Sequence, residues 1–309
     1  MTGIVTVTPN PGIDLTLTVP QLTLNQVLRA THTRSDMGGK GFNVSRALQA
    51  LGTPSVTMGF IGGFTGQRMA AGLQQIGLET DFVEIAGETR TNVVVTNETA
   101  SEHLKANEPG PEVTPGEIAA FFDRVSDRVR AGDTWVLSGS LPPGVPADFY
   151  AQLIESIQQV GARAVVDTSG EPLRQACHAR PFMVKPNDIE AEQVTGCPIE
   201  SEEDARRAAS DILGYGIKIV ALSLGAEGLI LATGDETLHA RPPHIQARNT
   251  VGAGDALVAG LVWALEQHLP LCDVARWGVA AGSVSAAREG VTFGTAGEVR
   301  QMLEKVRVS

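Results

Sequence analysis

Short apolar runs alternate along the chain with longer segments in which apolar residues recur every three or four positions. The short runs predict buried strands at Ile4–Thr8, Ser55–Phe60, Thr134–Leu137, Ala164–Val166, Phe182–Val184 and Ile217–Ser223. The helical spacing predicts helices at Asn43–Leu51, Gln67–Ile76, Gly116–Val129, Ala147–Val160, Glu202–Gly214, Ala256–Gln267, Cys272–Arg288 and Ala296–Val306. Strands that alternate with helices predict a mainly parallel sheet covered on both faces, which is an α/β fold.

Two Thr- and Val-rich segments, Asp14–Met37 and Thr89–Lys105, break this alternation. Polar and apolar residues alternate over Asp14–Val19 and Thr91–Thr96, as in strands with one exposed face. We expect the two segments to pair as a small separate sheet that acts as a lid, with ordinary edge hairpins as the alternative. No linker or repeat interrupts the chain, so we expect one domain over residues 1–309 with lid inserts at about 14–37 and 89–105.

The composition narrows the class of protein. The 309 residues include 24 Lys and Arg against 35 Asp and Glu, a net charge of −11, which argues against a general nucleic-acid binder or a protein of anionic membranes. No apolar stretch approaches the roughly 20 residues that span a bilayer, and no basic and apolar leader opens the chain. Cys177, Cys197 and Cys272 have neither disulfide-framework nor CxxC spacing, so we expect a soluble, cytoplasmic protein.

The strongest local motif is Asn249–Asp255, which directly precedes the apolar segment 256–265. The glycines at 252 and 254 let successive N–H groups point into one space at the start of a helix, which suits a phosphate. Asp255 would lie beside that anion, where a carboxylate can take a proton from an attacking hydroxyl. The alternative is that Gly254 permits the turn and Asp255 only caps the helix.

A second glycine cluster, Gly38–Val44, precedes the first predicted helix. Glycine allows close approach of the backbone to a ligand, Lys40 adds charge, and Asn43 can donate and accept hydrogen bonds. The cluster is not a Walker A loop, and the chain has no GxGxxG between a strand and a helix, so a dinucleotide-binding dehydrogenase lacks its main support. A plain turn is the alternative.

Three further polar segments follow predicted strands: Ser138–Gly144, Lys185–Glu190 and Ser223–Gly228. Open α/β sheets bind ligands at the carboxyl ends of their strands. Asn187 and Glu190 are close enough on a first helical turn to orient a hydrated Mg²⁺. Each segment alone could be a turn, but their recurrence at one edge of a sheet favours a binding site.

Basic residues in or near the lid-like segments could bind a phosphorylated substrate, since the guanidinium fork matches a phosphate group. These residues are Arg29, Lys40, Arg90 and Lys105. Solvated surface charge is the alternative for each of them. The six histidines show no HxH or HxxxH spacing, and we assign them no metal or catalytic role.

Taken together and in order, these motifs resemble the ribokinase-like, PfkB-type carbohydrate kinase family over nearly the whole chain. The segments that carry the resemblance are Asn10–Asp14, Gly38–Val44, Ser138–Gly144, Lys185–Glu190, Ser223–Gly228 and Thr250–Asp255. Each is weak alone, and the ordered set is specific. The resemblance implies a Rossmann-type three-layer α/β/α sandwich with a small β-sheet lid, through which members often form homodimers.

The resemblance also implies roles for individual residues. Asp255 matches the catalytic base, and the amides of Gly252, Ala253 and Gly254 match the anion hole for the transferring phosphoryl group. The matched ATP contacts are Lys185, Asn187, Ser223, Leu224, Gly225, Ala226, Glu227, Gly228 and Gly254, with Asn187 and Glu190 linked to Mg²⁺ through water. The matched substrate contacts are Asp14, Arg29, Gly38, Gly39, Lys40, Asn43, Arg90, Asn92, Ser138 and Gly139. Among these, Arg90, Lys40 and Arg29 would hold the substrate phosphate.

Within the family, the chain is most similar to the 1-phosphofructokinase and tagatose-6-phosphate kinase branch, through Asn10–Asp14, Gly38–Gly41, Thr89–Asn92 and Glu108–Pro111. This implies an ATP- and Mg²⁺-dependent kinase that converts fructose 1-phosphate to fructose 1,6-bisphosphate.

Alternatives stay open within and outside that branch. Val27 stands where related 6-phosphofructokinases often carry a basic residue, which leans away from fructose 6-phosphate, whereas Pro9 in place of the usual Leu leaves the choice open. Tagatose-6-phosphate kinase and 6-phosphofructokinase are the enzymatic alternatives. A non-catalytic sensor of sugar phosphate or nucleotide is a remote one, since it would have no need of the base. A K⁺ site near Asn249, Val251 and residues 286–290 is a further expectation from the family.

Overall fold

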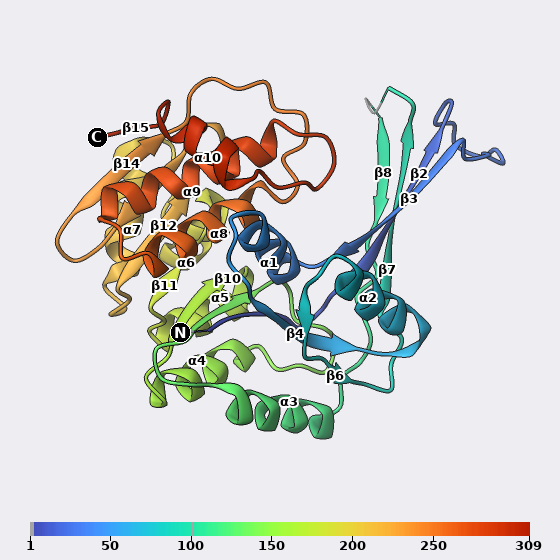
Figure 1. The fold of residues 1–309 in the computed structure, drawn as a ribbon, viewed down its shortest axis with the longest axis horizontal. Helices are drawn as coiled ribbons and strands as arrows, with labels where there is room; N and C mark the ends of the chain where they lie inside the picture. Colours follow the sequence, from blue (N-terminus) through green and yellow to red (C-terminus); the bar gives the residue numbers. More distant parts are fainter. Residues whose placement is uncertain (1–2, 100–101) are drawn as a thin grey trace.

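The computed structural model describes residues 3–99 and 102–309. In it, the apolar strands pair in one large sheet (Figure 1). Its centre is parallel, in the order β4 (Val56–Ile61), β1 (Ile4–Thr8), β9 (Thr134–Ser138), β10 (Arg163–Asp167), β11 (Met183–Val184) and β12 (Ile219–Ser223). Antiparallel strands β13 (Leu229–Ala232), β14 (Thr237–Arg241) and β15 (Arg307–Val308) extend one side, and β5 (Glu79–Thr80) and β6 (Val83–Glu84) pair with β4. The described strands of this sheet number eleven.

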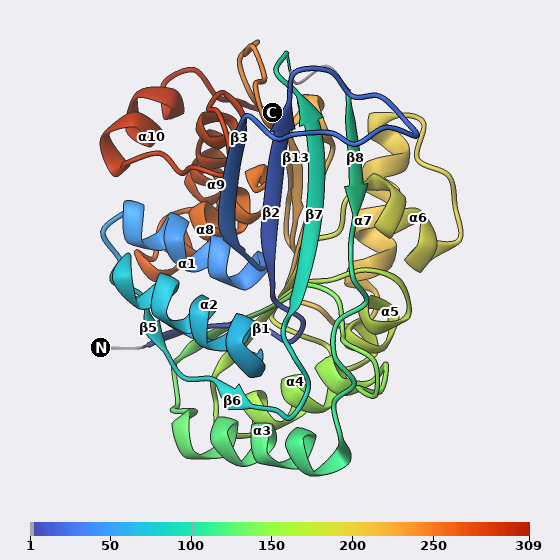
Figure 2. The ribbon, with the colours of Figure 1, turned by 90° about the vertical axis from the view of Figure 1, so that its right-hand side faces the viewer.

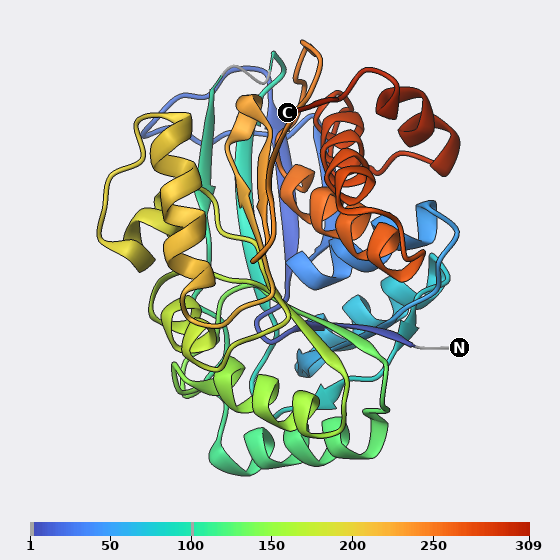
Figure 3. The same ribbon diagram turned by 90° about the vertical axis from the view of Figure 1, so that its left-hand side faces the viewer.

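Helices cover both faces of this sheet, as the sequence pattern predicts (Figure 3). One layer contains α3 (Pro115–Arg128), α4 (Phe149–Gln159), α5 (Gly170–His178), α6 (Asp188–Thr195) and α7 (Glu202–Leu213). The other contains α1 (Lys40–Ala50), α8 (Ala253–Glu266), α9 (Leu271–Ala286) and α10 (Ala296–Leu303). Successive strand residues point to opposite layers, so Val166 packs with the first core and Val165 with the second.

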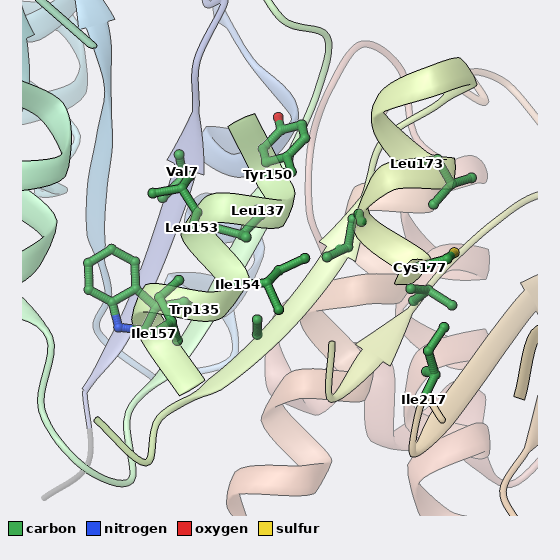
Figure 4. Close-up of a cluster of buried hydrophobic side chains, with 14 of the residues drawn as sticks. Val7, Trp135, Leu137, Tyr150, Leu153, Ile154, Ile157, Leu173, Cys177 and Ile217 are labelled. Carbon is green, nitrogen blue, oxygen red and sulfur yellow. The ribbon is translucent and has the colours of Figure 1, made fainter. Parts of the chain in front are cut away.

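The first core is close-packed around α4 (Figure 4). Leu153, Ile154 and Ile157 of this helix are fully buried in the cluster that contains Trp135 and Leu137 of β9. Such a core holds the central strands rigidly, so the loops at their carboxyl ends have fixed starting points.

The two Thr- and Val-rich segments form a separate four-stranded sheet and not edge hairpins of the large one (Figure 2). Its order is β3 (His32–Gly38), β2 (Gly12–Val19), β7 (Arg90–Asn97) and β8 (His103–Ala106), and β2 pairs with β7 in parallel. Residues 100–101 of the predicted insert lie outside the described residues. We use "lid sheet" below for these four strands. The helix α2 (Gly63–Gln75) packs at its base, together with Ile13 and Phe42.

Several predicted boundaries are wrong. The helices α1 and α8 each begin three residues early, at Lys40 and Ala253, because each starts in a polar and glycine-rich turn that carries no apolar period. The helix α2 begins at Gly63 for the same reason, and α10 ends at Leu303, before Val306. The short helix α5 and the hairpin β13–β14 were not predicted. Other predicted ends agree to within about two residues.

In the described part of the chain, none of the helices combines the length and the apolar character needed to cross a membrane.

Candidate active site

A cavity of about 430 Å³ lies between the carboxyl ends of the parallel strands and the lid sheet. Fourteen of the residues predicted from the sequence line it: Asp14, Gly38, Gly39, Lys40, Asn43, Arg90, Asn92, Lys185, Asn187, Glu190, Ser223, Gly252, Gly254 and Asp255. Lys105 and Val251, which the sequence analysis also mentions, are in the lining as well. The cavity therefore joins the lid sheet, the strand ends and the N-termini of α1, α6 and α8 in one place.

Asp255 lies in the first turn of α8 and is only 6% exposed. Gly252 caps the helix with a φ of 84°, a left-handed conformation that favours glycine. Asn43 of α1 donates a hydrogen bond from Nδ2 to Oδ2 of Asp255 at 2.8 Å. Burial, together with the negative charge of Asp167, raises the pKa of Asp255 to about 7, against the opposing effects of Asn43 and two lysines. A carboxyl group with this pKa can act as a general base near neutral pH.

Asp167, at the end of β10, is a buried carboxylate shared by two lysines. The Nζ atoms of Lys40 and Lys185 each lie 3.2 Å from its Oδ1. Burial would raise the pKa of Asp167, but the two lysines outweigh that effect and lower it. Burial likewise opposes the charge on Lys40, and the carboxylates of Asp167, Asp255 and Glu190 overcome it and raise the pKa of Lys40. Lys40 therefore stays charged beside the cavity.

Asn187 and Glu190 form the capping box of α6. The Asn187 Oδ1 accepts a hydrogen bond from Glu190 N at 2.7 Å, and the Glu190 Oε2 accepts one from Asn187 N at 2.9 Å. The backbone of Asn187 also forms an isolated parallel β-bridge with Ser223 at the end of β12. The box uses only one oxygen of the Glu190 carboxylate, so this residue fits a role in holding a hydrated Mg²⁺ beside a phosphate chain.

The lid sheet contributes polar groups that lack protein partners. Asn92 donates from Nδ2 to Oδ1 of Asp14 at 2.8 Å, whereas its own buried Oδ1 accepts no hydrogen bond from the described residues. The Arg90 guanidinium donates to the carbonyl oxygens of Asn10 and Glu108 at 2.8 and 3.0 Å, and its buried Nε–H has no partner among the described residues. Such unpaired buried groups indicate a polar ligand, because leaving them unpaired is costly.

The other predicted residues are not among the described residues that line the cavity. Ser138 is fully buried at the end of β9, and the Gly139 carbonyl accepts hydrogen bonds from the Tyr150 hydroxyl and the Thr168 Oγ1. Arg29 is exposed on the connection between β2 and β3, at the end of the lid sheet opposite the lining residues Gly12 and Asp14. The remainder are Ala253, which starts α8, and Leu224, Gly225, Ala226, Glu227 and Gly228, which follow the lining residue Ser223.

Sequence reasoning missed Gly12, Asn107 and, most importantly, Asp167. A signal for Asp167 exists, because Asp167-Thr168-Ser169-Gly170 directly follows the apolar strand Ala164–Val166, as the other binding segments follow theirs. Its pairing with Lys40 and Lys185 could not be read from the sequence, since the three residues are distant along the chain.

The described residues contain no group of three or more His, Cys, Asp or Glu side chains that could hold a metal ion by themselves. The segments expected near a K⁺ site do lie side by side, since the Ala286 carbonyl oxygen accepts hydrogen bonds from the backbone N–H groups of Arg248 and Asn249.

Comparison with known proteins identifies a family that matches most of the chain. Residues 4–296 match the family described as pfkB family carbohydrate kinase. The chain is 36% identical over 306 residues to the 1-phosphofructokinase of Bacillus subtilis (strain 168). This match covers 99% of each of the two chains. The structure of the present chain is similar to that of phosphofructokinase-2 from Escherichia coli in complex with potassium. The TM-score is 0.94, the identity is 31%, and the match covers 98% of this chain and 99% of the other. A tetrameric inhibited form of that same protein matches with a TM-score of 0.92, 31% identity and the same coverage.

The raised pKa of Asp255 predicts a pH-dependent cost to stability. The folded state keeps a proton up to a pH of about 7, whereas the unfolded chain releases it near pH 4, so stability falls as the pH rises between these values. Asp255→Asn removes this titration. Denaturant unfolding at pH 5, 6, 7 and 8 should show the variant gaining stability relative to wild type up to about pH 7 and then a constant difference.

Asp188→Asn is the matched control, because Asp188 is exposed in the first turn of α6. It should show no such trend. A stability difference for Asp255→Asn that stays constant over the whole pH range would contradict the pKa shift.

Proposed function

The chain belongs to the pfkB family of carbohydrate kinases, and from this premise we propose that it transfers the γ-phosphoryl group of ATP to the 6-hydroxyl of fructose 1-phosphate. That it is a sugar-phosphate kinase follows from relatives that match nearly the whole chain. The choice of fructose 1-phosphate as the acceptor is supported by the similarity to a 1-phosphofructokinase along 99% of the chain.

The observation that carries the proposal is the buried Asp255 carboxyl group at the start of α8. It lies in a cavity that is also lined by several lysine and arginine side chains. In this scheme Asp255 takes the proton from the attacking hydroxyl as the phosphoryl group arrives. The amide N–H groups of Gly252, Ala253 and Gly254 stabilise the charge on that group, since the first N–H groups of a helix lack intrahelical acceptors. Positioning and charge stabilisation supply most of the catalysis in such transfers.

Nucleotide and metal would occupy the end of the cavity formed by Lys185, Asn187 and Ser223. Lys185 would neutralise the phosphate chain of ATP, with residues 224–228 alongside. Mg²⁺, held by Glu190 and Asn187 through water, would supply further charge neutralisation between the phosphates. Asp255 would accept the proton, and the amide N–H groups at the start of α8 would stabilise the phosphoryl group as it is transferred.

The sugar phosphate would bind under the lid sheet. Asp14 and Asn92 offer carboxylate and amide groups to its hydroxyls. Arg90 keeps three of its five N–H donors after bonding Asn10 and Glu108, and Lys105 of β8 lines the same cavity. Arg90, Lys105 and Lys40 therefore form the proposed phosphate grip. Arg29, exposed on the β2–β3 connection, would join it only from a neighbouring subunit or after the connection moves.

The chain would form a homodimer through the lid sheet. Gly12 and Asp14 line the cavity, so the alternate residues Leu15 and Leu17 lie on the opposite face of β2. The register continues this second face through Val93, Val95 and Leu104, which is 50% exposed. A second copy of the same face would cover this apolar patch. A tetrameric form of a similar kinase is consistent with such self-association.

A monovalent cation would bind where Asn249 and Val251 approach residues 286–290. The similar kinase from Escherichia coli in complex with potassium supports this assignment. Activity measured in K⁺ against Na⁺ tests the monovalent site, and activity measured after removal of divalent ions by a chelator tests the Mg²⁺ site. Unchanged turnover in either experiment would overturn the corresponding proposal.

We also propose that the reaction takes place in the cytoplasm. The proposed reaction needs ATP, and the three unpaired cysteines fit a reducing compartment.

A substrate panel tests the proposed acceptor. ADP release with Mg·ATP should be compared by kcat/KM for fructose 1-phosphate, fructose 6-phosphate, tagatose 6-phosphate, fructose and ribose. We expect a preference for fructose 1-phosphate of about ten-fold or more, which is about 1.4 kcal/mol in transition-state binding. Preference for another sugar phosphate would keep the mechanism and replace the substrate. Turnover of unphosphorylated sugars alone would overturn the phosphate grip.

Asp255→Asn should lower kcat by about 10²-fold or more with little change in either KM, because the variant binds both substrates but cannot take the proton. The control Asp188→Asn, in the first turn of α6, should keep wild-type turnover. Near-normal turnover in Asp255→Asn would remove this residue from its role. ATP binding without any ADP release by the wild-type protein would favour the sensor.

Arg90→Ala should raise KM for the sugar phosphate by about ten-fold or more and change KM for ATP by less than about two-fold, because charge-assisted hydrogen bonds to phosphate are lost at one end of the cavity only. Arg124→Ala is the control, since Arg124 pairs with Asp81 on the surface of α3. Equal losses for both substrates, with a lowered melting temperature, would point to a folding defect.

Leu17→Lys should convert the dimer to a monomer, because it places a charge in the centre of the apolar face of the lid sheet. Light scattering after size-exclusion chromatography measures the mass directly. Val160→Lys, which changes an exposed residue at the end of α4, should leave the mass unchanged. A dimer that persists in Leu17→Lys would show that subunits meet elsewhere.

A further inference from the structure

His239 of β14 lies buried beneath residues 223–228, which we call the nucleotide loop, and is only 2% exposed. Its Nε2 lies 2.8 Å from the carbonyl oxygen of Glu227, in the short 3₁₀ turn Gly225–Glu227. A carbonyl oxygen can only accept, so Nε2 carries the proton in this bond and donates it. The loop is thus bonded to the sheet by a side chain that is not among the described residues lining the cavity.

The other side of the ring faces a fixed carboxylate. The Nδ1 atom of His239 lies 3.1 Å from Oε2 of Glu202, at the start of α7. Arg206 and Arg241 also bind Glu202, and its bonds to Arg206 and His239 hold the pKa of Glu202 at about 2. The carboxylate therefore stays charged and lies beside the edge of the ring that is opposite the Glu227 carbonyl.

The nucleotide loop is otherwise tied mainly to itself. Leu224 N donates to Gly228 O at 2.8 Å, and Glu227 N donates to Leu224 O at 3.0 Å. Gly228 packs so closely on β14 that a Cβ there would lie 2.1 Å from the Ala240 carbonyl oxygen. Gly225, Ala226 and Glu227 are exposed. Among the described residues, the bond from His239 is the side-chain hydrogen bond that joins the exposed turn to the sheet beneath it.

We propose that His239 is a positioning residue that holds the nucleotide loop in the conformation that binds ATP. This inference rests on the proposed function, because it takes residues 223–228 to contact the nucleotide. Without the bond, the Glu227 carbonyl loses a buried partner, and ATP must order the turn as it binds. Affinity for the nucleotide then falls, whereas Asp255 and the sugar-phosphate end of the cavity stay as they are.

The test compares His239→Leu with His239→Gln, whose amide nitrogen can still donate to Glu227. We expect His239→Leu to raise both KM for Mg·ATP and the calorimetric Kd for ATP about five- to ten-fold. Its kcat and its KM for the sugar phosphate should change less than two-fold. His239→Gln should restore ATP binding to within about two-fold of wild type. Leu238→Ala, one residue away on the opposite face of β14, should leave ATP affinity unchanged.

Glu202→Gln keeps the test decisive if His239→Leu folds poorly, because Glu202 lies near the surface and its loss frees the ring. It should weaken ATP binding two- to five-fold. Wild-type ATP affinity in folded His239→Leu, or equal defects in the folded Leu and Gln variants, would overturn this inference alone. If the wild-type protein binds no ATP, both this inference and the proposed function fail.

Discussion

The site depends on one buried carboxylate, Asp167, that Lys40 and Lys185 share. An isolated charge in such a place would be costly, and its partners make it stable. Burial raises the pKa of Asp255 to about 7, and the negative charge of Asp167 adds to this effect. Asp167 therefore gathers the lysines that a phosphate chain needs and helps to keep the base able to accept a proton near neutral pH. Removing it would disturb both ends of the reaction.

Four elements that are far apart in sequence deliver this cluster. Lys40 starts α1, Asp167 ends β10, Lys185 follows β11, and Asp255 lies in the first turn of α8. Parallel strands bring their carboxyl ends to one edge of the sheet, and the connecting helices begin there. The N-termini of α1 and α8 therefore add their positive ends to the same cavity. The fully buried core around α4 keeps these starting points fixed.

Much of this arrangement could be predicted from the sequence, because the informative residues are marked by local physics. Glycines before an apolar helix located Gly252 and Asp255, and period-2 segments located the lid sheet. The sequence analysis missed Asp167, because a single acidic residue after a strand is typical of an ordinary turn. Its role becomes visible only when its two lysine partners are known. The hairpin β13–β14 escaped because its strands are short and follow a glycine-rich turn. Long-range pairing, which decides such cases, leaves no mark within one segment.

The junction between the lid sheet and the large domain has a mechanical consequence. β3 ends at Gly38 and α1 begins at Lys40, so a single residue, Gly39, separates the lid from the helix that carries Lys40 and Asn43. Where the chain enters the lid sheet at β2, only three residues separate this strand from β1. Tethers this short cannot absorb a displacement, so any tilt of the lid moves the lysine and the asparagine that touch the two buried carboxylates. A tilt of the lid sheet would therefore change the electrostatics of the site as well as the access of solvent to it.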